Sequence, residues 1–337
     1  MKITDSPEFV RPRLSRISLA KGLVGLGISV VFVVLALRGV DLVEVWARMR
    51  EIDARLLPPI FVCLVVIFIL KAIRWQYLML PVKRIAFGRL FSAIIIGFMA
   101  NNSMPLRSGD LLRAHLLGKQ EGIGTTAVFA TVALDRIFEI LSVLTVSMLV
   151  LAMIPLPGWI WNAVIILGLA LVGVAAGVMV FYRPPKLVEK WWKTGRRVFP
   201  DRVQQALSLF IKEVRLGLGA GRGKVRLTNL YILAVSESAA WGILAYFSLK
   251  AVGIQLPLAG IMSTMVATNL VVAIPATPGN IGIFEFAVMT TLQFFQVDKD
   301  LALSGAVILH VIYVVPASLV GLAFFLGTWL LPKRVRE

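Results

Sequence analysis

Three ionisable residues stand inside a long apolar stretch of the chain, where a charge is costly. Asp135, Arg136 and Glu139 lie about 11 to 15 residues beyond Gly124, where the stretch begins, so a membrane-spanning helix would hold them near its middle. On one helix Asp135 and Glu139 share a face, and Arg136 reaches Glu139. Ionisable residues inside membrane spans are rare and mark functional sites by default. Two interpretations stay open: the three residues line a transport path, or they form a self-neutralised cluster that holds helices together.

A second charged group flanks a proline and a glycine. Arg107, Asp110 and Arg113 lie at the break that runs from Pro105 to Gly109. A helix beginning near Gly109 would direct backbone N–H groups and the positive end of its dipole toward the break. Because guanidinium groups bind phosphate through two parallel hydrogen bonds, these residues predict a phosphate site. The alternative is an ordinary basic loop on the cytoplasmic side of the membrane.

Two further carboxylates lie in apolar surroundings. Glu237 is about 12 residues into one apolar stretch, and Glu285 follows a second Pro/Gly break. Each could carry a proton, pair with Arg113 or Arg136, or bind an amine of a headgroup; a purely structural salt bridge is the alternative. His310 is alone among apolar neighbours, and we interpret it as a histidine satisfied within the core.

The composition is that of a membrane protein. Apolar residues make up 58% of the chain and charged residues 16%, with a mean hydropathy of +0.87, against about 45–50% and 25% in soluble domains. The net charge of +17 comes from basic residues clustered between apolar runs, which is the pattern that orients membrane proteins, so no nucleic-acid partner is predicted. The single cysteine, Cys63, lies in an apolar run. The sequence contains no metal-ligand cluster, phosphate loop, nucleophile elbow or dinucleotide fingerprint, and we predict no catalytic residue, metal or cofactor.

The apolar stretches predict an all-α, polytopic membrane protein. Six are long enough to cross a bilayer, which takes about 20 residues: Leu19–Leu37, Leu57–Leu80, Gly124–Ile154, Gly158–Tyr182, Arg226–Lys250 and Leu301–Leu331. Lys71 and Arg74, near the end of the second span, are expected to extend their charges toward the membrane surface. Between the first two spans, Val40–Arg55 is expected to form a short helix in the membrane interface.

Two apolar stretches end in Pro/Gly breaks. Arg89–Leu106 and Leu256–Ile274 are each followed by a break and a short helix. The first return helix has roughly 10 residues, or about 15 Å, which is half of a hydrocarbon core. The sequence therefore predicts two re-entrant hairpins, whose tips contain Pro105, Gly109, Pro275, Pro278, Gly279 and Gly282.

The basic residues predict how these elements are oriented. Segment 183–225, with the adjoining Arg226, carries twelve Lys and Arg residues and should be a cytoplasmic amphipathic segment, like both termini. The segment and the N-terminus share one face only if the first hairpin returns to its starting side. The second hairpin then opens to the opposite face. We therefore predict one transmembrane domain over residues 1–337, with a first repeat at 57–154 and an inverted second repeat at 226–331.

Four motifs together resemble the lysylphosphatidylglycerol synthase transmembrane family, of UPF0104 type. They are Ile73-Arg74-Trp75, the run from Asn101-Asn102-Ser103-Met104-Pro105 to Gly109-Asp110-Leu111-Leu112-Arg113, Asp135-Arg136-x-x-Glu139, and Pro278-Gly279-Asn280-Ile281-Gly282-Ile283-Phe284-Glu285. The family commonly has glutamate where Asp110 stands and glycine where Asn280 stands. The resemblance spans roughly residues 20–330 and implies lipid translocation by a stand-alone member without the soluble synthase domain.

We therefore expect a lipid flippase of the inner (cytoplasmic) membrane rather than an enzyme. Its partners would be membrane lipids with an anionic or phosphate-bearing headgroup. The residues expected to bind the headgroup are Arg107, Asp110, Arg113, Asp135, Arg136, Glu139, Glu237 and Glu285. The alternatives are a membrane-embedded transferase that acts on a lipid-linked substrate and a carrier for ions or small solutes. The sequence predicts no oligomeric state.

The predicted orientation can be tested at Lys193. A cysteine placed there should resist a membrane-impermeant thiol reagent in intact cells, because the basic segment should be cytoplasmic. The same reagent should label it once the cells are opened. Efficient labelling in intact cells would reverse the topology.

Overall fold

Every element in the described part of the chain is a helix. The computed structural model describes residues 42–104, 108–154, 227–273 and 278–327, with isolated positions at 34 and 37 and between 158 and 173. Within these ranges, four helices are long and apolar enough to cross a membrane: α3 (Leu57–Met79), α6 (Thr125–Met153), α10 (Leu227–Ala251) and α13 (Lys299–Phe325). They confirm the all-α prediction there. The predicted span Leu19–Leu37 and most of Gly158–Tyr182 lie outside the described residues, so the count of six spans stays a prediction.

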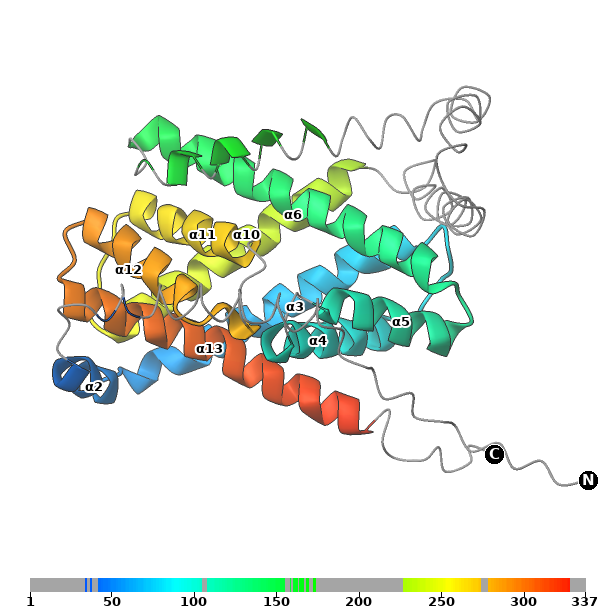
Figure 1. Ribbon diagram of the computed structural model, residues 1–337, viewed down its shortest axis with the longest axis horizontal. Coiled ribbons are helices and arrows are strands. Elements are labelled where there is room, and N and C mark those ends of the chain that lie inside the picture. Colours follow the sequence, from blue (N-terminus) through cyan, green and yellow to red (C-terminus); the bar gives the residue numbers. More distant parts are fainter. Residues whose placement is uncertain are drawn as a thin grey trace, which may run out of the picture.

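Two pairs of short helices complete the bundle. The first pair is α4 (Phe87–Ser103) and α5 (Gly109–Glu121), and the second is α11 (Leu258–Ala273) and α12 (Ile283–Phe294), preceded by the 3-10 turn η5 (Pro278–Asn280). Figure 1 shows the two pairs at opposite ends of the long helices. Helix α4 leads into the first break and contacts η5, which lies in the second break. The two breaks are therefore close to each other, between the two ends of the bundle. Pro105, Arg107 and Pro275 lie outside the described residues.

The same order of helix lengths occurs twice. Helices α3 to α6 have 23, 17, 13 and 29 residues, and helices α10 to α13 have 25, 16, 12 and 27. The first helices of the two series, α3 and α10, pack against each other and run in opposite directions (Figure 1). Helix α5, with 13 residues, is longer than the roughly 10 predicted, but at about 20 Å it still falls short of a bilayer core.

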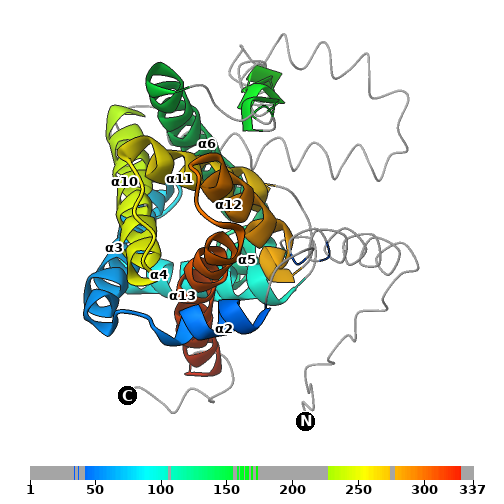
Figure 2. The same cartoon turned by 90° about the vertical axis from the view of Figure 1, so that its left-hand side faces the viewer.

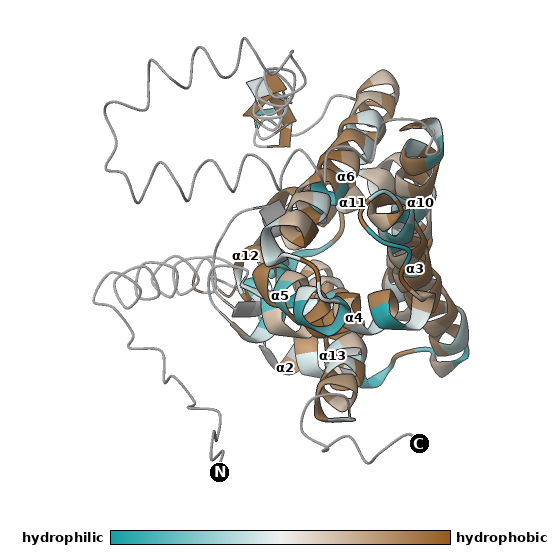
Figure 3. Cartoon of the chain, turned by 90° about the vertical axis from the view of Figure 1, so that its right-hand side faces the viewer, coloured by the Kyte–Doolittle hydropathy of each residue, from teal (hydrophilic) through white to brown (hydrophobic). Residues whose placement is uncertain are grey.

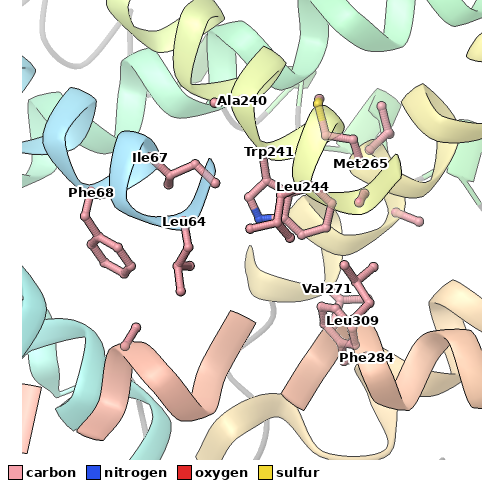
Figure 4. Close-up of a cluster of buried hydrophobic side chains, with 14 of the residues drawn as sticks. Leu64, Ile67, Phe68, Ala240, Trp241, Leu244, Met265, Val271, Phe284 and Leu309 are labelled. Carbon is pink, nitrogen blue, oxygen red and sulfur yellow. The ribbon is translucent and has the colours of Figure 1, made fainter. Parts of the chain in front are cut away.

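The outer surface of the long helices is apolar. Phe61 and Val62 on α3 and Leu319 on α13 are exposed, and Figure 3 shows apolar residues along most of each long helix. Inside, side chains such as Ile67 and Leu244 pack between the helices (Figure 4). A surface of this kind needs lipid around it.

A short helix lies outside the bundle, next to α13. It is α2 (Leu42–Arg50), which contacts α13 and crosses it in Figure 2. The exposed Trp46 ring lies 5.2 Å from the guanidinium carbon of Arg50. With the 3-10 turn η1 (Ala54–Leu56), α2 occupies the segment in which an interfacial helix was predicted.

Ion pairs close the base of the first helix pair. The buried carboxylate of Glu121, at the end of α5, accepts hydrogen bonds from Lys83 (2.8 Å) and Arg89 (2.5 Å). Hydrogen bonds from these two cations, Lys83 first, lower the pKa of Glu121. Gly122 follows with a φ of 66° and ends the helix in the left-handed conformation that favours glycine.

Glycine lets α4 and α5 approach closely. A Cβ atom on Gly109 would lie 2.0 Å from the carbonyl oxygen of Gly97 and 2.6 Å from the backbone nitrogen of Asn101. The packing of the first helix pair therefore requires a residue without a side chain at position 109.

Gly109→Ala should therefore destabilise the protein. Overpacking costs about 1–3 kcal/mol, and this contact is with backbone that cannot rotate away. The control is Gly88→Ala, where a Cβ atom meets nothing within 4 Å. Thermal unfolding of the purified variants measures the effect. Equal midpoints for both variants would contradict the close approach.

Candidate functional site

A buried guanidinium lies at the centre of the helix bundle. Arg74 of α3 has no exposed area and contacts carboxylates from two other helices. Its Nε donates to Asp135 (2.6 Å), its Nη1 to Glu237 (2.5 Å) and its Nη2 to Glu139 (3.1 Å). Lys71, one turn earlier on α3, lies 2.6 Å from Glu139 and 2.8 Å from Glu237. Two cations of α3 thus hold α6 and α10 together.

A second layer of ion pairs attaches α5. Arg136 of α6 lies 2.8 Å from Asp110 and 2.6 Å from Glu139. The Nη2 of Arg113 lies 3.2 Å from Asp110 and 3.8 Å from Asp135. The Arg113 guanidinium carbon also lies 5.1 Å from the centre of the Trp75 ring, which is a cation–π contact.

These eight side chains form one network, which we call the ion network. Its members are Lys71, Arg74, Asp110, Arg113, Asp135, Arg136, Glu139 and Glu237. Four cations face four carboxylates, so the fixed charges of the network balance. Each carboxylate has at least two cationic partners within 4.0 Å.

The network corrects two expectations from the sequence. Lys71 and Arg74 do not extend toward the membrane surface; they point into the bundle, because the carboxylates there offset the cost of burying them. Glu237 pairs with these two cations and not with Arg113 or Arg136. The sequence did indicate that further cations were needed inside the bundle. It placed three carboxylates in the middle of membrane spans but only one arginine.

Arg136 follows its prediction in part. The predicted contact with Glu139 is confirmed. The contact with Asp110 was not foreseen, and it joins the first helix pair to α6.

The second helix pair carries its own charged contact. Glu285 of α12 lies 2.5 Å from the Nδ1 of His310 on α13 and accepts a hydrogen bond of 2.6 Å from the backbone N–H of Gly282. Of the roles left open for Glu285, pairing with Arg113 or Arg136 is therefore not the one observed. His310 does have a polar partner within the bundle, as expected, and that partner is Glu285.

A cavity of about 280 Å³ lies between the ion network and the two helix breaks. Five predicted site residues line it on one side: Asp110, Arg113, Arg136, Glu139 and Glu237. Elsewhere its wall is aromatic and amide-bearing: Phe68, Phe98, Trp241, Phe284, Tyr313, Asn101, Asn102, Asn269 and Asn280. Figure 4 shows Phe68, Trp241 and Phe284, which come from α3, α10 and α12. Asp135 and Glu285 are not in the wall, but each forms an ion pair with a residue that is, Asp135 with Arg113 and Glu285 with His310.

One predicted hairpin-tip residue, in the second break, reaches this cavity. Gly279 lines it with a φ of 69°, next to Asn280, whose φ is 54°. Gly282, with a φ of 87°, precedes α12, and Pro278 begins η5. Left-handed backbone at three nearby positions turns the chain sharply at the cavity.

Within the described residues, no group of three or more His, Cys, Asp or Glu side chains could hold a metal ion. The site therefore offers ion pairs, amides and aromatic rings. Such groups are able to form hydrogen bonds and charge contacts with a polar molecule.

Arg74→Met should destabilise the protein more than Arg136→Met. Breaking a buried ion pair typically costs about 3–5 kcal/mol, and Arg74 has no exposed area whereas the Arg136 side chain is 31% exposed. Thermal unfolding midpoints of the purified variants measure the order. Arg55→Met, at an exposed position, is the control. A smaller loss for Arg74→Met than for Arg136→Met would contradict the central role of Arg74.

Comparison with known proteins identifies the family of the chain. Residues 22–321 match the family described as the Lysylphosphatidylglycerol synthase TM region. The chain is 24% identical over 340 residues to Glycosyltransferase AglD of Haloferax volcanii, which covers 90% of this chain and 53% of that protein. UPF0104 membrane proteins of Methanothermobacter thermautotrophicus and Methanocaldococcus jannaschii are 23% and 26% identical, covering 78% and 63% of this chain and 80% and 85% of theirs.

The chain thus spans about half the length of the glycosyltransferase and most of the length of these two membrane proteins. Because the family match extends over most of the 337 residues, the chain belongs to the Lysylphosphatidylglycerol synthase TM region family of membrane proteins.

Proposed function

We propose that the chain translocates a lipid across the membrane, with the headgroup passing through the central cavity while the acyl chains stay in the bilayer. One observation carries this proposal. A cavity lined by ionised groups lies inside a bundle with an apolar outer surface, at the point where two interrupted helices meet. Interrupted helices around a central polar site are typical of transporters.

The size of the cavity favours a headgroup over a whole lipid. Pockets that enclose a small molecule measure about 300–1,000 Å³, and this cavity is about 280 Å³. A headgroup of a few polar groups fits such a volume. Acyl chains would remain against the apolar faces of the long helices.

The proposed cycle uses the two helix pairs as re-entrant hairpins that open to opposite faces. Two observations support this use of the helix pairs. The order of helix lengths is repeated, and the pairs lie at opposite ends of the bundle (Figure 1). In this arrangement the two series form an inverted repeat in the inner membrane, with both termini in the cytoplasm. Such repeats give one central site alternating access to the two faces.

Arg113 is the cation of the ion network that we assign to the headgroup phosphate. It lines the cavity, and its Nε is buried without a hydrogen-bond partner among the described residues. If Arg113 turns to a phosphate, Asp110 keeps Arg136 and Asp135 keeps Arg74. Arg107, which we include in the phosphate site from its place in the sequence, lies outside the described residues.

A membrane-embedded transferase is the second candidate, because one relative is named a glycosyltransferase. Such an enzyme needs a carboxylate or another base that is free to take a proton from the acceptor. The four carboxylates of the ion network are each held by at least two cations. Within the ion network, this arrangement leaves no carboxylate free to act as that base.

Reconstituted vesicles test the proposal. The purified protein should move a fluorescent or short-chain phospholipid between leaflets, and mass spectrometry should recover that lipid chemically unchanged. Arg113→Lys keeps the charge but loses the planar fork, so the rate should fall about tenfold or more, with a smaller effect on stability. Arg55→Lys, at an exposed position, is the matched control.

Two outcomes would contradict this function. Transfer of a chemical group onto the lipid would identify a transferase. No translocation of any anionic or zwitterionic lipid by a folded protein would remove the flippase proposal.

A further inference from the structure

The contact between Glu285 and His310 adds a titratable pair to a cavity where, among the described residues, the charges of the ion network balance. The ion network contributes four positive and four negative charges. Glu285 contributes one further negative charge. His310 lines the cavity, while Glu285 stands behind it at 2.5 Å. The charge facing a headgroup thus depends on whether His310 carries a proton.

The geometry indicates which atom takes the proton. Both carboxylate oxygens of Glu285 are occupied, Oε2 by the N–H of Gly282 and Oε1 by Nδ1 of His310. With Nδ1–H donating to Glu285, the other ring nitrogen, Nε2, has a free lone pair. A proton added there converts a pair of net charge −1 into a neutral pair.

We propose that the Glu285–His310 pair is a proton-binding site, and that a proton taken up on His310 Nε2 accompanies an anionic headgroup into the cavity. This inference rests on the proposed lipid translocation. Counting the described residues, an anion that enters beside an unprotonated pair adds a second negative charge that the ion network does not compensate. Protonation of His310 removes the net negative charge of the Glu285–His310 pair. Binding of the headgroup and binding of the proton therefore favour each other.

The surroundings of His310 suit a cation. The Phe284 ring is stacked on the imidazole with centres 4.3 Å apart and planes 21° from parallel. An aromatic face stabilises a cation placed over it. His310 is buried, so the carboxylate acts on it with little screening by water.

The pair is also tied to the turn of the second helix break. Glu285 caps α12 through Gly282, two residues after Asn280 at the cavity wall. A change in the charge of His310 alters the attraction on Glu285 and hence on this turn. Proton binding and the position of the second hairpin are therefore linked.

Six of the seven other titratable groups in the described cavity wall are already held in ion pairs, and the seventh is a tyrosine. They come from α3, α5, α6, α10 and α13: Lys71, Asp110, Arg113, Arg136, Glu139, Glu237 and Tyr313. The first six are held in the ion network. The residues of α4, α11 and η5 that line the cavity carry no titratable side chain. Among the described lining residues, His310 is thus the one whose ring can accept a further proton without breaking an ion pair.

Nitrogen-15 histidine NMR tests the proton site without any lipid substrate. The chain has two histidines, and His115 is exposed on α5, so each spectrum contains one signal from the pair and one reference. The full chain in detergent should show His310 gaining and losing a proton between about pH 5 and 8. In Glu285→Gln, His310 should protonate at lower pH than in the unchanged chain, while His115 should not change. His115→Gln assigns the signals.

A His310 signal that keeps one protonation state throughout this range would overturn the proton site. A titration of His310 that Glu285→Gln leaves unchanged would overturn the role of the pair. Thermal unfolding of each variant verifies that it is folded.

Calorimetry tests the coupling. Binding of dioctanoyl phosphatidylglycerol, whose phosphodiester does not titrate near neutral pH, is measured in two buffers of different ionisation enthalpy. We expect up to about one proton taken up per lipid above the titration range of His310. Binding of dioctanoyl phosphatidylcholine should be accompanied by the uptake of fewer protons. The substitution His310→Gln should abolish the proton uptake that accompanies phosphatidylglycerol binding.

The outcomes separate the two proposals. Phosphatidylglycerol binding without proton uptake, or with uptake that survives His310→Gln, overturns the coupling and leaves lipid translocation intact. Failure of every lipid to bind or move contradicts the proposed function and the coupling with it. The NMR titration still decides whether the pair binds a proton.

Discussion

The Arg74 guanidinium has no contact with solvent, so it is stable only where carboxylates surround it. This requirement determines which helices pack against α3. Moving an ion out of water costs several kcal/mol even after the protein relaxes, and only close partners with good geometry repay it. In lipid, apolar side chains give helices little reason to choose one neighbour over another. Arg74 supplies that choice, because Asp135 and Glu139 lie on α6 and Glu237 lies on α10. A rotation of any of the three helices would separate a charge from its partner.

The two helix pairs are fastened to this centre by different chemistry. The first is held by fixed charges, since Asp110 on α5 contacts Arg136, and by the close approach at Gly109. The second is held through Glu285 and His310, whose attraction depends on protonation. The first pair is therefore held by ion pairs, and the second by a contact whose strength depends on whether His310 carries a proton. An asymmetry of this kind lets two halves of similar helix order take different parts in one cycle.

The helices and their breaks could be predicted from the sequence, and the partners of the charges could not. Long apolar runs and Pro/Gly breaks are local patterns, so α3, α6, α10 and α13 begin within a few residues of their predicted starts. Ion pairing depends on how each helix is rotated. The partners of Arg74 are 61, 65 and 163 residues away in the chain, and no local pattern selects among several acids at such distances. Counting charges by span would have shown that mid-span carboxylates outnumbered mid-span cations, which points to Lys71 and Arg74.

Each carboxylate of the ion network has more than one cationic partner, which would let the proposed headgroup enter without breaking the bundle apart. A buried carboxylate that lost its only partner would be strongly destabilised. Here each carboxylate has at least two cationic partners, so one cation can turn away while its former partners remain paired. Arg113 has the longest ion-pair contacts in the network and a buried Nε without a partner among the described residues, so its release loses least. A phosphate that accepts from Arg113 then exchanges partners within the network and leaves none of its carboxylates alone. For the proposed translocation, this means that the ion pairs that join the helices can also exchange partners with a headgroup without isolating a buried charge.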